Sequence, residues 1–159
     1  MLNIFTVAFF GHRDVLDSFS LEQQLEKETT KLISQKQYVE FLVGRNGEFD
    51  KIVSRVIRKI KREITDDNSS LILVLPYLTA EYTKNVNQFD NYYDEVEICE
   101  ASSLSHPKAA IQIRNRKMVD RADLIITYVE KNEGGAYKTV KYASEQNKPI
   151  INLADFVDD

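Results

Sequence analysis

Residues 114–143, RNRKMVDRADLIITYVEKNEGGAYKTVKYA, contain the local pattern that decides the fold. The run 124–129 is rich in β-branched and aromatic residues and has charged residues on both sides, which is typical of a short, buried strand. A polar loop follows and ends in Gly134 and Gly135, directly before an amphipathic segment, 136–147, that predicts a helix. The stretch therefore predicts a strand, a glycine loop and a helix N-terminus in succession.

This arrangement suits an anion. The first backbone N–H groups of a helix lack intrahelical partners and carry the positive end of the helix dipole, and a ligand can approach them closely past glycine. Phosphate is the natural ligand at such a place. The alternative is that Gly134 and Gly135 only form a tight turn.

The same alternation extends over the rest of the chain. Four further apolar runs predict buried strands, at residues 3–10, 38–43, 71–75 and 149–153. Helices are predicted between them at residues 21–35 and 49–64, and a third helix, capped by Ser105 and with Pro107 in its first turn, runs to about residue 121. Strands joined by helical crossovers predict an α/β, Rossmann-like three-layer sandwich with a mainly parallel five-stranded sheet, whose simplest strand order is 3-2-1-4-5.

The chain, residues 1–159, reads as a single domain with one long insertion at about 77–105. The insertion interrupts the alternation and is rich in aromatic residues. A connection of this length in a compact domain is usually a lid or a binding loop, which we favour here, or else it contains a short element that the pattern does not reveal.

Composition excludes several classes of protein. The formal net charge of −4 argues against a generally basic surface that coats nucleic acid. The single cysteine, Cys99, cannot form an internal disulfide, and no Cys/His spacing resembles a metal site. The first residues do not resemble a signal peptide, and no apolar run is long enough to span a membrane. We therefore expect a cytoplasmic protein with no metal and no membrane partner.

The strand order predicts where a ligand binds. In open α/β sheets, ligands lie at the carboxyl ends of the strands that flank the point where the order reverses. The loops after the first, second and fourth predicted strands should therefore meet around one crevice, together with one face of the helix before residue 124. The candidate ligand-binding residues are Gly11, His12, Arg13, Gly44, Arg45, Gly47, Arg114, Asn115, Gly134, Gly135 and Thr139.

Two of these candidates have clear alternatives. Arg13 offers bidentate hydrogen bonds to phosphate or carboxylate, or it forms a surface ion pair with Asp14 or Asp17. His12 is a candidate general base because imidazole titrates near neutral pH, but a loop histidine more often hydrogen-bonds the backbone.

The helix before residue 124 carries two more candidates. Asn115 lies within its apolar arc, and Arg114 lies at the edge of that arc. A buried amide must find partners, so Asn115 either holds a neighbouring loop or touches a ligand. Arg114 either reaches the crevice or pairs with an acid such as Glu97.

Four segments follow one another along the chain: FFGHR at 9–13, the run RNRKMVDRAD at 114–123, GGAYKTVKYA at 134–143 and the final KPIINL at 148–153. In sequence and order they resemble the motifs of the SLOG superfamily of Rossmann-like proteins, in particular its small bacterial YpsA-like members. The resemblance implies a pocket for a nucleotide or nucleotide derivative above a parallel sheet. Some relatives bind DNA, and others are phosphoribohydrolases.

The chain departs from the family at several positions. Phe10 replaces a threonine, and Arg45 replaces a glycine in the segment that resembles G-G-x-x-G-x-D; Asp50, which matches its last position, either caps a helix or binds a ribose hydroxyl. Lys141 stands where phosphoribohydrolases have a glutamate that works at the glycosidic carbon, and Thr139 remains as a substitute phosphate ligand. Without that glutamate, hydrolysis by this route is not expected.

The leading prediction is therefore binding or sensing of a nucleotide or ADP-ribose-like ligand, with phosphate on Gly134, Gly135 and Thr139 and with Arg13 as counter-charge, and with no required cofactor. The alternative is an N-glycosidic hydrolase or transferase with His12 and a carboxylate from the insertion. The carboxylates in question are Asp94, Glu95 and Glu97. A second alternative is single-stranded DNA binding through Arg45, Arg114, Arg116 and nearby tyrosines. The negative net charge of the chain argues against this alternative. A homodimer stays open.

Overall fold

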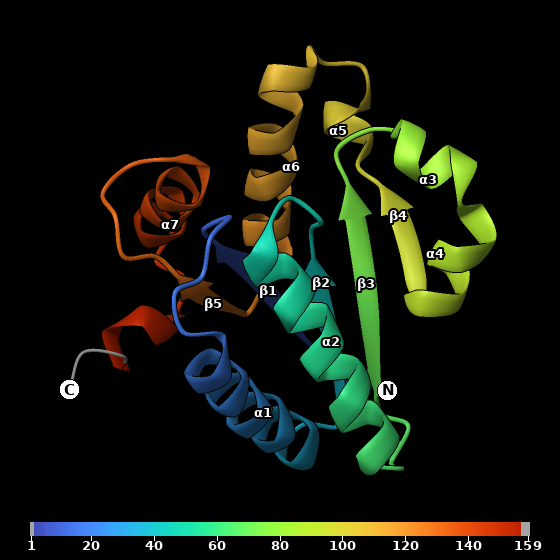
Figure 1. Ribbon diagram of the computed structural model, residues 1–159, viewed down its shortest axis with the longest axis vertical. Helices are drawn as coiled ribbons and strands as arrows, with labels where there is room; N and C mark the ends of the chain where they lie inside the picture. Colours follow the sequence, from blue (N-terminus) through green and yellow to red (C-terminus); the bar gives the residue numbers. More distant parts are fainter. Residues whose placement is uncertain (1, 157–159) are drawn as a thin grey trace.

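A six-stranded parallel sheet forms the centre of the molecule in the computed structural model, which describes residues 2–156 (Figure 1). The strands lie in the order β4-β3-β2-β1-β5-β6, and every neighbouring pair is parallel. Their bounds are β1 Ile4–Gly11, β2 Tyr38–Val43, β3 Ser69–Leu75, β4 Glu95–Ile98, β5 Leu124–Tyr128 and β6 Ile150–Asn152.

Helices cover both faces of this sheet. Their bounds are α1 Ser18–Gln35, α2 Glu48–Glu63, α3 Ala80–Lys84, α4 Val86–Tyr92, α5 Glu100–Ser103, α6 Pro107–Arg121 and α7 Gly135–Glu145, and a short 3₁₀ turn, η1 Leu153–Phe156, follows β6. The helices α1 and α2 pack side by side on one face, and α6 and α7 pack on the other (Figure 1). The layers are therefore helix, sheet and helix.

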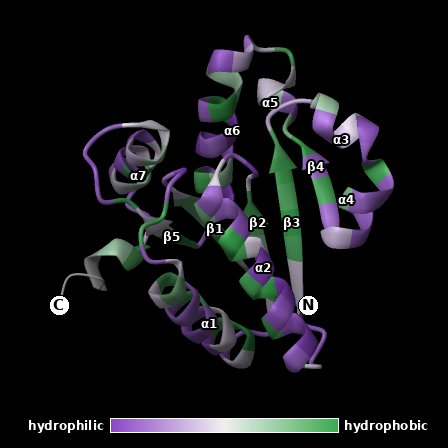
Figure 2. Ribbon diagram, in the orientation of Figure 1, coloured by the Kyte–Doolittle hydropathy of each residue, from purple (hydrophilic) through white to green (hydrophobic). Residues whose placement is uncertain are grey.

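The strand β1 shows why the sheet lies between two cores. Val7 and Phe9 belong to the core under α1 and α2, whereas Ala8 and Phe10 belong to the core under α6 and α7. Successive side chains of a strand point to opposite faces, so a strand covered on both faces is apolar at most positions. Figure 2 shows the contrast between the largely hydrophobic strand β3 and the mixed helices.

The prediction of a Rossmann-like three-layer fold is confirmed. The five predicted strands lie in the predicted order, because β3, β2, β1, β5 and β6 are neighbours in that sequence. The prediction of five strands is wrong by one, since β4 adds a sixth strand beside β3. It has only four residues, and two of them are the glutamates Glu95 and Glu97, so its apolar signal is weak.

The insertion at 77–105 holds short regular elements, which was the alternative to the lid or binding loop that we favoured. It contains α3, α4, β4 and α5, and it extends the sheet at the edge furthest from β6. Phe89 and Tyr93 pack into the core under α1 and α2, and Phe89 and Tyr82 form an edge-to-face pair. The insertion is thus an ordered edge of the domain.

None of the helices in residues 2–156 combines the length and the apolar composition that crossing a membrane requires.

Candidate functional site

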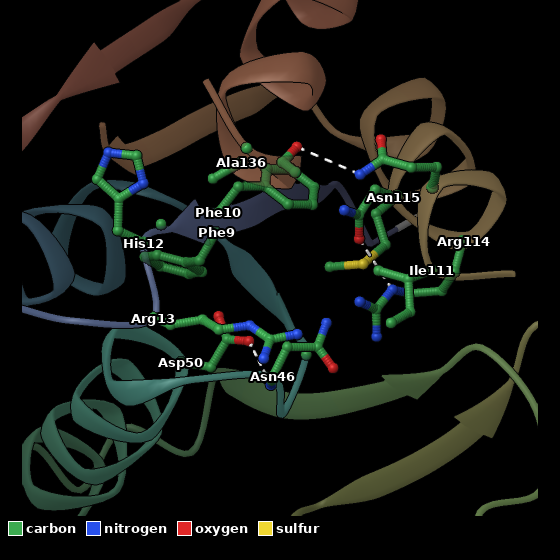
Figure 3. Close-up of a pocket in the computed structure, with 16 residues that line it drawn as sticks. Phe9, Phe10, His12, Arg13, Asn46, Asp50, Ile111, Arg114, Asn115 and Ala136 are labelled. Atoms are coloured by element: carbon green, nitrogen blue, oxygen red, sulfur yellow. Dashed lines mark hydrogen bonds between the residues drawn. The ribbon is translucent and has the colours of Figure 1, made fainter. Parts of the chain in front are cut away.

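A pocket of about 250 Å³ opens at the carboxyl ends of β1, β2 and β5 (Figure 3). The loops after these three strands and one face of α6 form its wall. Besides the predicted candidates, the lining residues are Phe9, Phe10, Asn46, Asp50, Ile111, Gln112, Met118 and Ala136. Figure 3 shows that Arg13 and Arg114 reach the cavity from opposite sides.

The structure brings most of the predicted candidates to this pocket. The predicted residues among its lining are Gly11, His12, Arg13, Gly44, Arg114, Asn115, Gly134 and Gly135. They come from four different elements, and the reversal of strand order between β1 and β5 brings those elements together.

Arg114 is the most unusual of these residues because its side chain is charged and only 1% of the residue is exposed. Its Nε donates to Asn115 Oδ1 at 3.0 Å, and its Nη1 donates to the Val74 carbonyl at 2.8 Å. Burial lowers the pKa of Arg114, and the nearby Asp50 carboxylate opposes that shift. The arginine therefore reaches the pocket and does not pair with Glu97.

Asp50 faces Arg114 across the pocket floor. It lies in the first turn of α2, and its Oδ2 accepts a hydrogen bond from the backbone N–H of Asn46 at 2.9 Å. Burial raises the pKa of Asp50, whereas the Asn46 amide and the charge of Arg114 lower it. The bond to Asn46 agrees with the capping alternative for Asp50, but the carboxylate also lines the cavity.

His12 ties together two loops of the pocket. Its Nε2 accepts hydrogen bonds from the backbone N–H groups of Glu130 and Lys131, at 3.0 and 3.1 Å. This is the backbone-binding alternative for His12, and it occupies the nitrogen that a general base would need. Burial and the charge of Lys131 lower the pKa of His12, and Glu130 opposes them.

The glycine loop forms an uncapped helix start at the pocket. Gly134 is the N-cap of α7 and has a φ of +94°, which L side chains rarely adopt, and no side chain caps this helix. The first N–H groups of α7 therefore lack a side-chain partner, and Gly134, Gly135 and Ala136 all line the cavity. The electropositive end of the helix points at the site.

Thr139 supports this helix start and does not line the pocket. Its residue is 1% exposed, its Oγ1 donates to the Gly135 carbonyl at 3.0 Å, and Asn115 Nδ2 donates to the same Oγ1 at 3.1 Å. Gln112 Nε2 also donates to the Gly135 carbonyl, at 3.3 Å. The polar side chain of Asn115 thus finds its partners in Arg114 and in Thr139 of α7.

Arg45 and Gly47 lie outside the cavity, although their loop neighbours line it. Arg45 points to the insertion, where its Nε donates to Glu81 at 3.0 Å and its Nη1 to Tyr93 Oη at 3.1 Å. A Cβ on Gly47 would lie 2.6 Å from the Cα of Arg13, so this glycine permits close packing of two loops.

The acidic residues of the insertion lie on other parts of the surface. Glu97 is on β4, three strands away from β1, and its carboxylate pairs with Arg121 at 3.0 Å. Asp94 accepts a hydrogen bond from the Leu71 N–H at 2.7 Å. Neither residue lines the pocket, where Asp50 is the only carboxylate among the described residues. Residues 2–156 also contain no group of three His, Cys, Asp or Glu that could hold a metal ion.

Sequence reasoning missed the apolar wall of the pocket, and it considered Asp50 only as a helix cap or as a partner of a ribose hydroxyl. Phe9, Phe10, Ile111 and Met118 line the pocket beside the charged groups. The replacement of the family's threonine by Phe10 was the one available signal for this wall.

Comparisons with known proteins identify the fold and no sequence family. No protein-family model matches the chain, and no curated protein matches it. Two solved structures of DNA processing protein A (DprA) are similar. The protein from Streptococcus pneumoniae superposes with a TM-score of 0.67 at 14% identity, over 92% of this chain and 49% of that one. The protein from Helicobacter pylori superposes with a TM-score of 0.60 at 15% identity, over 92% of this chain and 63% of that one.

The chain thus spans about half the length of the first of these proteins and less than two thirds of the second. The Helicobacter pylori structure is described as revealing a unique single-stranded DNA binding mode. At this level of identity the likeness concerns the fold alone, and the YpsA-like assignment stays a prediction. The chain has a DprA-like, Rossmann-type fold, in agreement with the resemblance to the SLOG superfamily.

Proposed function

We propose that the pocket between the loops after β1 and β5 binds a nucleotide or a nucleoside-phosphate derivative. The observation that carries this proposal is Arg114, a buried guanidinium at the cavity wall. It has five N–H donors, of which two have partners among residues 2–156, so three remain for a ligand.

The rest of the lining supports the same class of ligand. Two features of the lining suit phosphate, the uncapped start of α7 and the exposed Arg13. The Arg13 side chain has no ion pair or hydrogen bond within the described part of the chain, so neither Asp14 nor Asp17 competes for it. Phe9, Phe10, Ile111 and Met118 supply the apolar surface that a nucleobase needs.

The second candidate is single-stranded DNA, and the comparisons support it more directly than they support a free nucleotide. The similar protein from Helicobacter pylori is the one whose DNA binding mode is described. A strand would place one of its nucleotides in the same pocket. Arg45 and Arg116 lend little support to a longer basic track, because Arg45 pairs with Glu81 and Arg116 lies over the ring of Tyr142.

A binding experiment with the whole chain separates the two candidates. Thermal shift and calorimetry would compare nucleoside monophosphates, NAD, ADP-ribose and a short thymidine strand. A specific ligand raises the melting temperature with its concentration. DNA binding would weaken steeply with salt, because each phosphate contact releases counterions.

The Arg13→Ala variant tests whether Arg13 contacts the phosphate of the ligand. Loss of a charge-assisted contact should weaken binding roughly tenfold or more. Arg62→Ala removes an exposed arginine at the far end of α2 and should leave affinity unchanged. Absence of any stabilisation by every nucleotide and by the DNA strand would refute both candidates.

A further inference from the structure

Gly44 leaves a gap between two buried charges at the inner end of the pocket. A Cβ on this residue would lie 3.2 Å from Asp50 Oδ2 and 3.1 Å from Arg114 Nη1. The carboxylate and the guanidinium do not form an ion pair within 4.0 Å, so they flank this point without closing on each other. We call this gap, bounded by Gly44, Asp50 and Arg114, the Asp–Arg slot.

Both sides of the Asp–Arg slot have unused hydrogen-bonding capacity. Asp50 accepts one bond, from the Asn46 N–H, although a carboxylate has about four acceptor positions. Arg114 has used two of its five donors. Leaving two buried charges only partly satisfied is costly, and a group that bridges them would recover part of that cost.

The chemistry of the two sides restricts what can bridge them. The Asp50 carboxylate accepts and the Arg114 guanidinium donates, so the ligand must present donors next to an acceptor. A phosphate offers only acceptors at neutral pH, and the Asp50 charge would repel it. The apolar neighbours Phe10, Ile111 and Met118 further require a flat group with apolar faces. A nucleobase with a polar edge meets all these conditions.

Guanine fits this pattern best among the bases. Its N1–H and N2–H donors are adjacent and can both bond one carboxylate, and its O6 and N7 acceptors follow on the same side, where arginine is their commonest specific partner. Adenine offers one donor group beside an acceptor and would satisfy Asp50 with one bond fewer. We propose that the Asp–Arg slot, which rests on the nucleotide site proposed above, selects guanine, with Asp50 bonding N1–H and N2–H and Arg114 bonding O6.

The bound nucleotide then has a fixed direction. Its base lies in the Asp–Arg slot, beside the apolar wall. Its phosphate lies at the start of α7, which also lines the pocket. A nucleotide within a DNA strand would bind in the same orientation. The group that is recognised is therefore a guanine base with an attached phosphate, whether it belongs to a free nucleotide or to a DNA strand.

Calorimetry with the whole wild-type chain tests the selectivity directly. GMP should bind at least tenfold more tightly than AMP, CMP or UMP, and IMP, which lacks the 2-amino group, should fall between GMP and AMP. For the DNA source, a thymidine strand with one guanine should bind more tightly than the same strand with one adenine. Equal affinities within both panels overturn the guanine inference and leave the proposed function standing. No binding in either panel overturns both.

Two variants test the slot itself. Asp50→Asn turns one acceptor oxygen into a donor amide, so it should lose the preference for GMP and gain affinity for xanthosine monophosphate, which has a carbonyl in place of the 2-amino group. A purely structural role for Asp50 would not produce this exchange, and retention of the GMP preference overturns the assignment. Asp66→Asn, in an exposed turn, is the matched control.

Gly44→Ala fills the slot and leaves the two charged residues, Asp50 and Arg114, unchanged. Its φ is not positive, so alanine is compatible with the backbone, and its Cβ would crowd both charged groups. The variant should lose the preference for GMP over AMP while it keeps a folded circular-dichroism spectrum. An unchanged preference in a folded variant overturns the assignment of the slot.

Discussion

Arg114 and Arg45 belong to two regions that the sequence predicted to form one site, and they differ in almost every physical respect. Arg114 lies in the pocket at the reversal point of the sheet, where it is buried and retains free donors. Arg45 lies toward the insertion, where Glu81, Tyr93 and the ring of Phe89 engage its guanidinium.

The comparison teaches that the type of residue is a weaker sign of function than its burial and its state of pairing. Arg45 is partly exposed and makes three hydrogen bonds to Glu81 and Tyr93, and ion pairs of this exposed kind contribute little to stability. A buried guanidinium with unused donors costs free energy, and this cost is reasonable if a ligand offsets it.

Among the variants considered, Arg114→Leu should cause the largest loss of stability. A small loss would remove the contrast between Arg114 and Arg45. The substitution leaves the Val74 carbonyl and Asn115 Oδ1 without their donor, and it removes the positive charge near the buried Asp50. We expect the free energy of unfolding to fall by about 3–5 kcal/mol. Urea titration followed by circular dichroism measures this change, and a loss below about 1 kcal/mol would contradict the buried position of the arginine.

Phe89→Ala tests whether the insertion is an ordered edge of the domain. Phe89 is 6% exposed and contacts the rings of Tyr82 and Tyr93. Truncation of a buried phenylalanine should cost about 3 kcal/mol of unfolding free energy, without weakening nucleotide binding. The same denaturation and calorimetry experiments apply, and a cost near zero would indicate that the insertion packs loosely.

The pH dependence of stability tests the contact of His12 with the loop after β5. Because His12 is partly exposed, this contact should contribute less to the free energy of unfolding than Arg114 or Phe89 does. The pKa of His12 is lowered in the folded state from 6.5, so the unfolded chain binds more protons between the folded pKa and 6.5. The contribution of neutral His12 is therefore present above pH 6.5 and is lost as the pH falls through the folded pKa.

Denaturation between pH 8 and pH 5 should show this loss in the wild-type chain. The His12→Gln variant should show a weaker pH dependence, because glutamine does not titrate. Identical profiles for the two proteins would argue against a role for the His12 contact with the amides of Glu130 and Lys131.

Arg45→Gln should have the smallest effect. The ion pair with Glu81 is exposed to solvent, so its loss should cost less than about 1 kcal/mol, and nucleotide affinity should not change. A fall in affinity similar to that of Arg13→Ala would remove the distinction between the two regions, and Arg45 would then belong to the site as the sequence predicted.

Local patterns in the sequence determined most of the fold. The apolar runs of β1, β2, β3, β5 and β6 are visible without a structure, because strands inside a parallel sheet are apolar at most positions. Their order was predicted as the simplest one for a five-stranded Rossmann-like sheet. The crevice followed from that order, and with it the placement of Arg13, Gly134 and Gly135 at the pocket.

Only the tertiary structure decided the chemistry of the pocket. The burial of Arg114, its distance from Asp50 and the gap left by Gly44 depend on residues that are far apart in the chain. The strand β4 escaped prediction for a related reason, since four residues with two glutamates become a strand only through pairing with β3. Periodicity reports which face of an element is apolar, whereas the partners of a buried charge are set by packing between elements, and this packing leaves no local pattern in the sequence.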